Sequence, residues 1–165
     1  YKIASEGGHP SAPVNLGILY ATGKGTEKDP AAALAQFDIA LERGNGRGGT
    51  NGAQMFISGR IDGPIGSAAS RAAKAATLSN VRTAERAIER LNEMSAKEID
   101  AGAQSLMVQL GADITVDGDF GSGSQRALDQ LNSIYNAQVG DTGSDRLLAL
   151  AKLYWKNNKF RVDLY

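Results

Sequence analysis

The chain has 165 residues, of which 42% are apolar and only 6% aromatic, and its 18 basic and 18 acidic side chains give zero formal charge. This balance offers no electrostatic attraction to nucleic acid, so no nucleic-acid partner is expected. The absence of cysteine excludes disulfides, thiolate zinc sites and cysteine catalysis, and a single histidine, His9, cannot form a multi-histidine metal site. We therefore expect no metal and no cofactor.

Alanine and leucine supply most of the apolar content, which favours helices over a sheet core rich in β-branched and aromatic side chains. No segment approaches the ~20 apolar residues of a membrane span, so no membrane contact is expected within this chain. Residues 1–6 lack the charged start and apolar centre of a signal peptide. A targeting segment, if the protein is exported, is expected upstream.

Residues 12–22 and 30–43 are predicted to form two helices joined by a short turn. Leu16, Leu19 and Tyr20 lie near helical spacing in the first. Gly23 favours the left-handed conformation that ends a helix, and Asp29-Pro30 is a typical helix start. The second helix places one apolar face toward the first, formed by Ala33, Phe37, Ala40 and Leu41.

The first part of the chain repeats with an offset of 36 residues. Tyr1 falls on Phe37, and the segment Leu19-Tyr20 falls on Met55-Phe56. Periods of roughly 34–40 residues are typical of stacked helical hairpins. Residues 1–8 match the end of a second helix, and a hairpin cannot bury its apolar face with one helix alone. We therefore expect the chain to be a fragment, although a short helical amino-terminal cap would give the same pattern.

The complete copy carries a family pattern: Asn15-Leu16-Gly17-Ile18-Leu19-Tyr20, then Gly23-Lys24-Gly25, Asp29, Ala33, Phe37, Ala40 and Gly44. It resembles the Sel-one-like repeat, a relative of the tetratricopeptide repeat. The second copy matches less well, because Gly52 and Gln54 replace apolar residues and Ile61 replaces a turn glycine. The resemblance implies a concave protein-binding face formed by first-helix residues, for which the candidates are Asn15, Ile18, Tyr20, Asn51 and Gln54. The alternative is that Ile18 and Tyr20 are core residues.

Residues 80–93 are predicted to form an amphipathic helix that caps the hairpins. Its apolar stripe consists of Val81, Ala84, Ala87, Ile88 and Leu91. Ser95 with Glu98 forms the sequence pattern of a capping box, which predicts a helix from Ser95 to about Leu110.

Three helices are predicted in the second half of the chain. After the helix that Ser95 begins, a loop ends in Asp117-Gly118-Asp119-Phe120-Gly121. Ser122 with Gln125 predicts a second capping box and a helix to about residue 136, and a last helix covers residues 144–155. In the loop, Asp117-Gly118 is a turn pair, and we expect Phe120 to fill the gap between helices.

This order resembles the peptidoglycan-binding-like domain of bacterial envelope proteins. The resemblance is carried by Ala103-Gln104, Met107, Leu110-Gly111, Val116-Asp117-Gly118-Asp119-Phe120-Gly121, Ser124, Ala127, Leu128, Leu131 and Asn132. Leu131-Asn132 stands where the family has phenylalanine-glutamine, and Ala103 replaces a leucine. The resemblance implies peptidoglycan as a partner. Polar residues around the start of the second helix are the candidate contacts, namely Asp119, Ser122, Gln125 and Arg126.

Three motifs with catalytic or ligand-binding associations have structural explanations. Residues 44–49 satisfy the dinucleotide pattern G-x-G-x-x-G but follow a predicted helix instead of a strand. A calcium loop beginning at Asp113 would need a carboxylate where Ser124 stands. Glutamates at 85, 89, 93 and 98 alternate with basic residues, as on a solvated helix face. No catalytic residue is predicted.

The combined prediction is an all-α chain with a short solenoid of helical-hairpin repeats and a small three-helix domain. The boundaries are 1–79 for the repeats, 80–94 for the connecting helix, 95–155 for the peptidoglycan-binding-like domain and 156–165 for a tail. The domain order resembles the periplasmic region of alphaproteobacterial cell-polarity scaffold proteins. This implies a non-catalytic periplasmic scaffold that binds other envelope proteins. The alternative is an accessory region of a larger hydrolase, a cell-wall or caspase-like enzyme with its catalytic domain upstream.

Overall fold

The computed structural model describes residues 1–78, 80–140 and 142–162, and this part of the chain is helical with no β-strand. Its helices are α1 Lys2–Glu6, α2 Ala12–Thr22, α3 Pro30–Glu42, α4 Gly46–Ile57, α5 Ser67–Ala76, α6 Val81–Asn92, α7 Ala96–Gln109, α8 Ser122–Tyr135 and α9 Gly143–Val162. The all-α prediction is therefore confirmed. None of the described helices is long and apolar enough to span a membrane.

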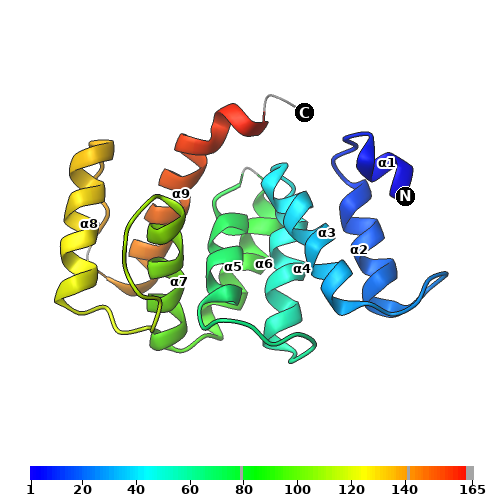
Figure 1. Cartoon of the computed structure of the whole chain (residues 1–165), viewed down its shortest axis with the longest axis horizontal. Helices are drawn as coiled ribbons and strands as arrows, with labels where there is room; N and C mark the ends of the chain where they lie inside the picture. The colour runs from blue at the N-terminus through cyan, green and yellow to red at the C-terminus, as the bar shows by residue number, and fades with distance from the viewer. Residues whose placement is uncertain (79, 141, 163–165) are drawn as a thin grey trace.

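The helices stand side by side along the long axis of the molecule, close to chain order (Figure 1). Helix α2 packs on α3, α3 on α4, and α4 on α5, so each neighbour in sequence is also a neighbour in space. Helix α5 contacts α6, α7 and α9 as well. Helix α8 lies at the far end and packs on α7. Helix α5 is thus shared by the first and second halves of the chain.

The predicted ends of α2 and α3 agree with the structure. Gly23 follows α2 in the left-handed conformation, with φ of 73°. The Asp29 side chain caps α3 by accepting a hydrogen bond of 2.9 Å from the backbone N–H of Ala32. The buried residues of α3 are the four predicted for its apolar face. Local side-chain and backbone chemistry therefore defines this hairpin.

Helix α4 packs closely between α3 and α5, and two of its glycines are required by this close approach. A Cβ on Gly48 would collide with the backbone oxygen of Phe37, and one on Gly49 would lie 2.8 Å from the backbone oxygen of Arg71. Both glycines are buried. Helix packing therefore explains Gly49, the last glycine of the G-x-G-x-x-G pattern, and Gly48 beside it.

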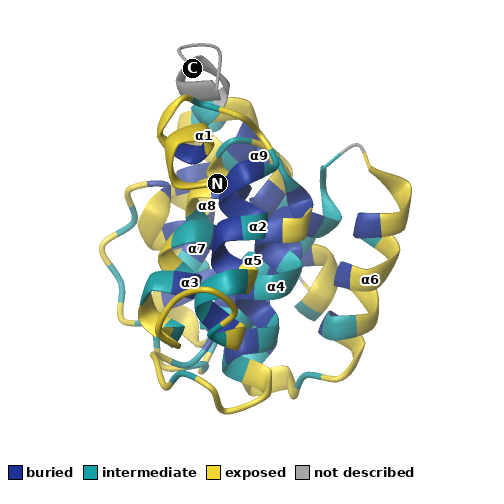
Figure 2. Cartoon of the chain, turned by 90° about the vertical axis from the view of Figure 1, so that its right-hand side faces the viewer, coloured by how far each residue is buried: buried dark blue, intermediate teal, exposed yellow. Residues whose placement is uncertain are grey.

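The largest apolar cluster extends from Ala53 on α4 to Leu153 on α9. It includes the alanines of α5, the apolar face of α7 and the inward side of α9. Viewed from the amino-terminal end, buried residues fill the centre and exposed ones the periphery (Figure 2). One apolar core therefore continues across residues 80–94, the segment predicted to connect two domains.

Helix α6 buries a narrower stripe than its sequence pattern predicts. Two residues of the predicted apolar stripe remain exposed, Val81 at 71% and Ile88 at 43%. The buried residues are Thr83, Ala87 and Leu91. A Cβ on Gly46 would lie only 2.7 Å from the Thr83 methyl carbon, so Thr83 lies directly against the start of α4.

Two predicted details at the carboxy-terminal end differ from the structure. The capping box of Ser122 and Gln125 does not form, because α8 has Gly121 as its N-cap and no side-chain cap. Helix α9 continues past Trp155 to Val162, so most of the predicted tail is helical. The sequence of the tail is compatible either with docking of Phe160, Leu164 and Tyr165 across the helices or with binding of a partner, and these three side chains lie outside the described ones.

Replacing Ser95 with alanine should lower the free energy of unfolding by about 1 kcal/mol at neutral pH, the usual cost of losing an N-cap. Ser95 accepts a hydrogen bond from the Glu98 backbone N–H, which is the N-cap bond. The Glu98 carboxylate in turn accepts from the Ser95 backbone N–H at 2.9 Å and from the Ser95 hydroxyl at 2.7 Å, which completes the predicted capping box. These bonds lower the pKa of Glu98 from 4.5. The part of the stabilisation that the carboxylate bonds supply is therefore lost as the pH falls through that lowered pKa, whereas the N-cap bond itself remains. Denaturant titrations at neutral and acidic pH should show the difference between the two proteins shrinking in acid.

Candidate functional site

The loop between α7 and α8 is organised by the side chain of Gln104. This residue is only 1% exposed on α7. Its carbonyl oxygen accepts hydrogen bonds from the backbone N–H groups of Asp117 and Gly118, at 3.1 and 2.8 Å. Its amide nitrogen donates to the Asp117 carboxylate at 2.9 Å and lies 3.0 Å from both the Asp119 backbone oxygen and the Ser124 hydroxyl. One buried amide thus connects the loop to α7 and to the start of α8.

The same Asp117 carboxylate oxygen closes a turn within the loop by accepting from the backbone N–H of Asp119 at 2.9 Å. This bond and the bond from Gln104 lower the pKa of Asp117, so the side chain is ionised at neutral pH. Gly118 has φ of 77°, and a Cβ there would lie 2.6 Å from the backbone oxygen of Lys97. Glycine is therefore required at this position by both conformation and space.

Phe120 packs against the main apolar cluster, as predicted for a residue that fills the gap between helices. The Arg146 guanidinium of α9 lies over the ring, 3.5 Å from its centre. Arg146 is itself buried and forms an ion pair with Asp100 of α7 at 3.2 Å. The aromatic residue of the loop therefore lies at the junction of α7 and α9.

A groove of about 600 Å³ lies beside this loop and the start of α8. Three of the four predicted peptidoglycan contacts line it, namely Asp119, Ser122 and Arg126. Gln125 is not among the lining residues, and its amide donates to Asp129 one turn further along α8, at 3.0 Å. The other polar side chains lining the groove are Gln104, Asp113, Thr115, Asp117, Ser124 and Gln130.

No protein-family model, curated protein or solved structure matches this chain. The groove has hydroxyl, carboxamide, carboxylate and guanidinium groups around an open hollow, which suits hydrogen bonding to a polar ligand. Within the described residues, no three histidine, aspartate or glutamate side chains are placed to hold a metal ion. The groove is therefore a candidate site for binding a polar ligand.

The predicted protein-binding residues of the hairpins differ in their surroundings. On α2, Ile18 is exposed, Asn15 is half-buried, and Tyr20 packs against the small cluster around Phe37. On α4, Asn51 and Gln54 are half-buried. The Gln54 side-chain oxygen has no hydrogen-bond partner although it is buried. Ile18, which is 36% exposed, is the most exposed residue of this set.

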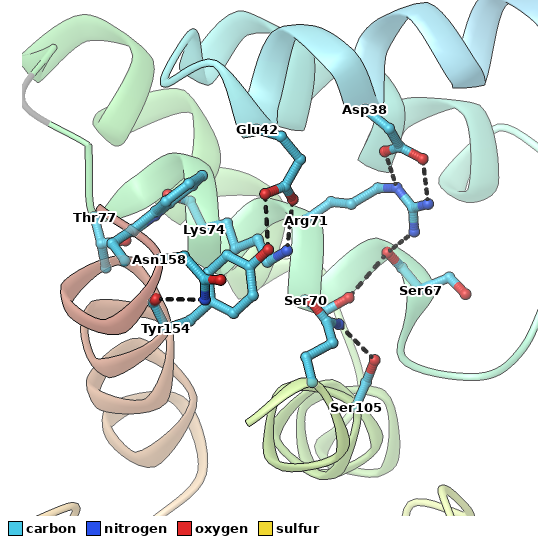
Figure 3. Close-up of polar contacts among 12 residues, drawn as sticks. Asp38, Glu42, Ser67, Ser70, Arg71, Lys74, Thr77, Ser105, Tyr154 and Asn158 are labelled. Atoms are coloured by element: carbon cyan, nitrogen blue, oxygen red, sulfur yellow. Dashed lines mark hydrogen bonds and ion pairs between the residues drawn. The ribbon is translucent and has the colours of Figure 1, made fainter. Parts of the chain in front are cut away.

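A charged network between α3, α5 and α9 was not predicted (Figure 3). Asp38 and Arg71 form a two-pronged ion pair with distances of 2.7 and 2.8 Å. One turn along, the buried Lys74 ammonium lies 2.8 Å from Glu42 and 3.7 Å from the centre of the Tyr154 ring. Tyr154 also donates a 2.7 Å hydrogen bond to Glu42. The network therefore attaches α9 to two hairpin helices.

Sequence reasoning missed Lys74, and it used Gln104 only as part of the family pattern without its hydrogen bonds, because each residue acts on partners that are not its neighbours in the chain. The partial signal was spacing: Asp38 and Glu42 lie one helical turn apart, as do Arg71 and Lys74. An acidic pair and a basic pair at this spacing are compatible with pairing between two helices.

The free energy of unfolding of the wild-type protein should increase at alkaline pH relative to that of a Lys74→Met variant, which has no ammonium group. Burial lowers the pKa of Lys74 from 10.5, against the opposing effect of Glu42. The folded protein thus binds this proton less tightly than the unfolded chain does, so the free energy of unfolding rises as the pH increases from the lowered pKa to 10.5. Urea titrations at neutral pH and near pH 10 should show that the free energy of unfolding of wild type, relative to that of Lys74→Met, is higher at the alkaline pH. An unchanged difference would contradict the lowered pKa.

Proposed function

We propose that this chain is a non-catalytic scaffold segment of a bacterial envelope protein. In this proposal α2 to α5 are Sel-one-like hairpin repeats that bind protein partners, and α7 to α9 form a peptidoglycan-binding-like domain that associates with the cell wall. The two surfaces would act together in the periplasm. There the protein would help to organise the envelope or cell polarity.

The packing of consecutive helices supports the repeat part of the proposal. Helices α2 and α3, then α4 and α5, form successive pairs, and α3 also contacts α5 as repeats in a stack do. The small residues at the crossings, such as Gly17 against Phe37, allow the close approach that hairpin repeats use.

The observation that carries the wall-binding part is the ordered loop with its groove. Gln104 holds the backbone at Asp117, Gly118 and Asp119, so the polar groups around the groove have defined positions before any ligand arrives. A site formed in advance loses less entropy on binding than a flexible one does. A glycan or stem peptide offers many hydroxyl, amide and carboxylate groups that such a groove can bind.

The second candidate function is an accessory region that positions an upstream hydrolase. The same groove would then direct the enzyme to its substrate, and the hairpins would contact the catalytic domain. The wall-binding step is common to both candidates, so its test bears on each of them.

Sedimentation with purified peptidoglycan sacculi tests wall binding. We expect wild type to be found in the pellet and the Arg126→Glu variant to bind about tenfold more weakly, since one charge-assisted hydrogen bond is lost and a repulsive charge is introduced. Arg126 is exposed, so the variant should fold normally. Arg86→Glu reverses an exposed charge on α6 and is the matched control.

Equal pelleting of the Arg126→Glu and Arg86→Glu variants would show that binding does not use the groove. Wild type that stays in the supernatant would remove wall association as a function of this chain. Protein partners bound through the hairpins would then be the remaining part of the proposal.

A further inference from the structure

A second hollow lies where the loop between α4 and α5 meets the corner between α6 and α7, and it shares no lining residue with the groove beside loop 111–121, the loop between α7 and α8. Its volume is about 310 Å³. Its apolar lining comes from two separate stretches and consists of Phe56, Ile57, Ile61, Pro64, Ile65, Ala68 and Met94. Ile57 is 39% exposed, so this lining is open to solvent. Both segments run along the lower edge of the molecule in Figure 1.

The charged residues that line this hollow are all acidic, namely Asp62, Glu93 and Glu98. Glu98 is held in place by Ser95, and the same hydrogen bonds lower its pKa, so it is ionised at neutral pH. Glu93 forms an exposed ion pair of 3.3 Å with Arg90, which partly balances one of the three charges. The nearby Arg71 guanidinium is 5.0 Å from the Phe56 ring and is paired with Asp38. The two basic residues of the same segments, Arg60 and Lys97, do not line the hollow, and the Lys97 side chain lies against Gly118 of the α7–α8 loop. The side chains that line the mouth are therefore negative around an apolar floor.

Met94 also lines a neighbouring hollow of about 560 Å³, which includes Leu91, Ile99 and Phe120. The charged lining residues of that hollow, Asp100 and Arg146, are paired with each other. A methionine side chain between the two hollows can adapt its shape to an occupant. The apolar floor thus extends from α4 past Met94 toward Phe120, far enough for more than one side chain of a bound segment.

We propose that this surface, the acidic groove of residues 56–68 and 93–98, binds a peptide segment of a partner protein in which apolar side chains are flanked by lysine or arginine. The apolar floor receives the aliphatic or aromatic anchors, and the carboxylates at the rim pair with the flanking cations. Charge complementarity decides the chemistry of the occupant. The groove beside loop 111–121 and the predicted face of α2 play no part in this binding, so it does not depend on the wall-binding proposal.

The test uses a fluorescent peptide with leucine and phenylalanine at its centre and two lysines at each end, titrated into the full chain at low ionic strength. A counterpart with glutamates in place of the lysines is the peptide control. We expect saturable binding of the lysine peptide, with amide NMR shifts concentrated in residues 56–68 and 93–98. The double variant Asp62→Lys with Glu93→Lys should bind it about tenfold more weakly.

Two protein variants separate the apolar and the charged contributions. Ile57→Ser leaves the charges at the rim unchanged and should weaken peptide binding only by removing apolar contacts with the floor of the groove. Glu85→Lys with Glu89→Lys reverses two exposed charges on α6 outside the groove and should change the affinity by less than about twofold.

The proposal is overturned by a lysine peptide that does not bind, by equal binding of the glutamate peptide, or by shifts centred on other residues. Equal losses in the groove variant and the α6 control would also overturn it, because they would indicate attraction by overall charge. The sacculi experiment is independent of each of these outcomes.

Discussion

The Gln104→Ala variant is expected to lose about 3 kcal/mol of unfolding free energy, because five hydrogen bonds of one buried side chain disappear together. Two backbone N–H groups of the loop and the Ser124 hydroxyl would lose their partner, and a cavity would remain on α7. Water can reach part of the loop, so the loss stays below the sum for five fully buried bonds. Chemical denaturation measures the change.

Gln109→Ala is the matched control, since Gln109 is an exposed residue on the same helix with one 3.4 Å contact to Ser105. It should change stability by less than about 0.5 kcal/mol. A Gln104→Ala protein as stable as this control would mean that the loop does not depend on the amide. Sacculi binding should fall in the Gln104→Ala variant even at temperatures where it is fully folded, because the groove is no longer held in shape.

The Lys74→Glu variant is expected to lose about 4 kcal/mol, the largest effect among the substitutions considered. It would place a carboxylate at a site 6% exposed, next to the carboxylate of Glu42 and beneath the ring of Tyr154. An uncompensated buried charge costs about 3–5 kcal/mol in proteins. Thermal unfolding and denaturant titration both measure the loss.

Lys74→Met separates charge from packing. Methionine fills a similar space beside the Tyr154 and Trp155 rings without the cost of desolvating an ammonium group, and the Glu42 side chain is 46% exposed, so it can be hydrated. We expect its stability within about 1 kcal/mol of wild type. Lys152→Glu, an exposed reversal on α9, is the control for a change in net charge.

Trp155 reports on this region directly. It is the single tryptophan of the chain, and its ring N–H donates a 3.1 Å hydrogen bond to the backbone oxygen of Lys74. A red-shifted emission in Lys74→Glu, with wild-type emission in Lys74→Met, is the expected pattern. Identical emission and stability in all three proteins would contradict the role of the network in attaching α9.

Helix ends were predicted well where the residues that cap the helix lie within a few positions of the groups they bond to. Asp29 and Ser95 cap their helices as expected, because an N-cap bonds to an N–H only three positions away. The pattern at Ser122 and Gln125 is similar, but Gly121 takes the cap position, which moves Ser122 into the first turn. A shift of one residue is enough to remove a capping box, and the sequence pattern alone does not define that register.

Tertiary partners could not be predicted from one sequence. The Glu42–Tyr154 hydrogen bond joins residues 112 positions apart, and nothing in their local patterns connects them. Gln104 was recognised as part of the family pattern, yet its hydrogen bonds to the loop depend on how α7 and the loop fold back together. Val81 and Ile88 fit an amphipathic stripe but are exposed, because α6 contacts its neighbours through a narrower face.

Helix α5 packs against the hairpin helices on one side and against α7 and α9 on the other. A Cβ on Gly102 of α7 would lie only 2.7 Å from that of Ala69, so α5 and α7 are in close backbone proximity. Direct packing between helices, and not a flexible linker, consequently fixes the orientation of one end of the molecule relative to the other. With the wall bound at one end and a protein at the other, the chain would serve as a spacer of constant length between them.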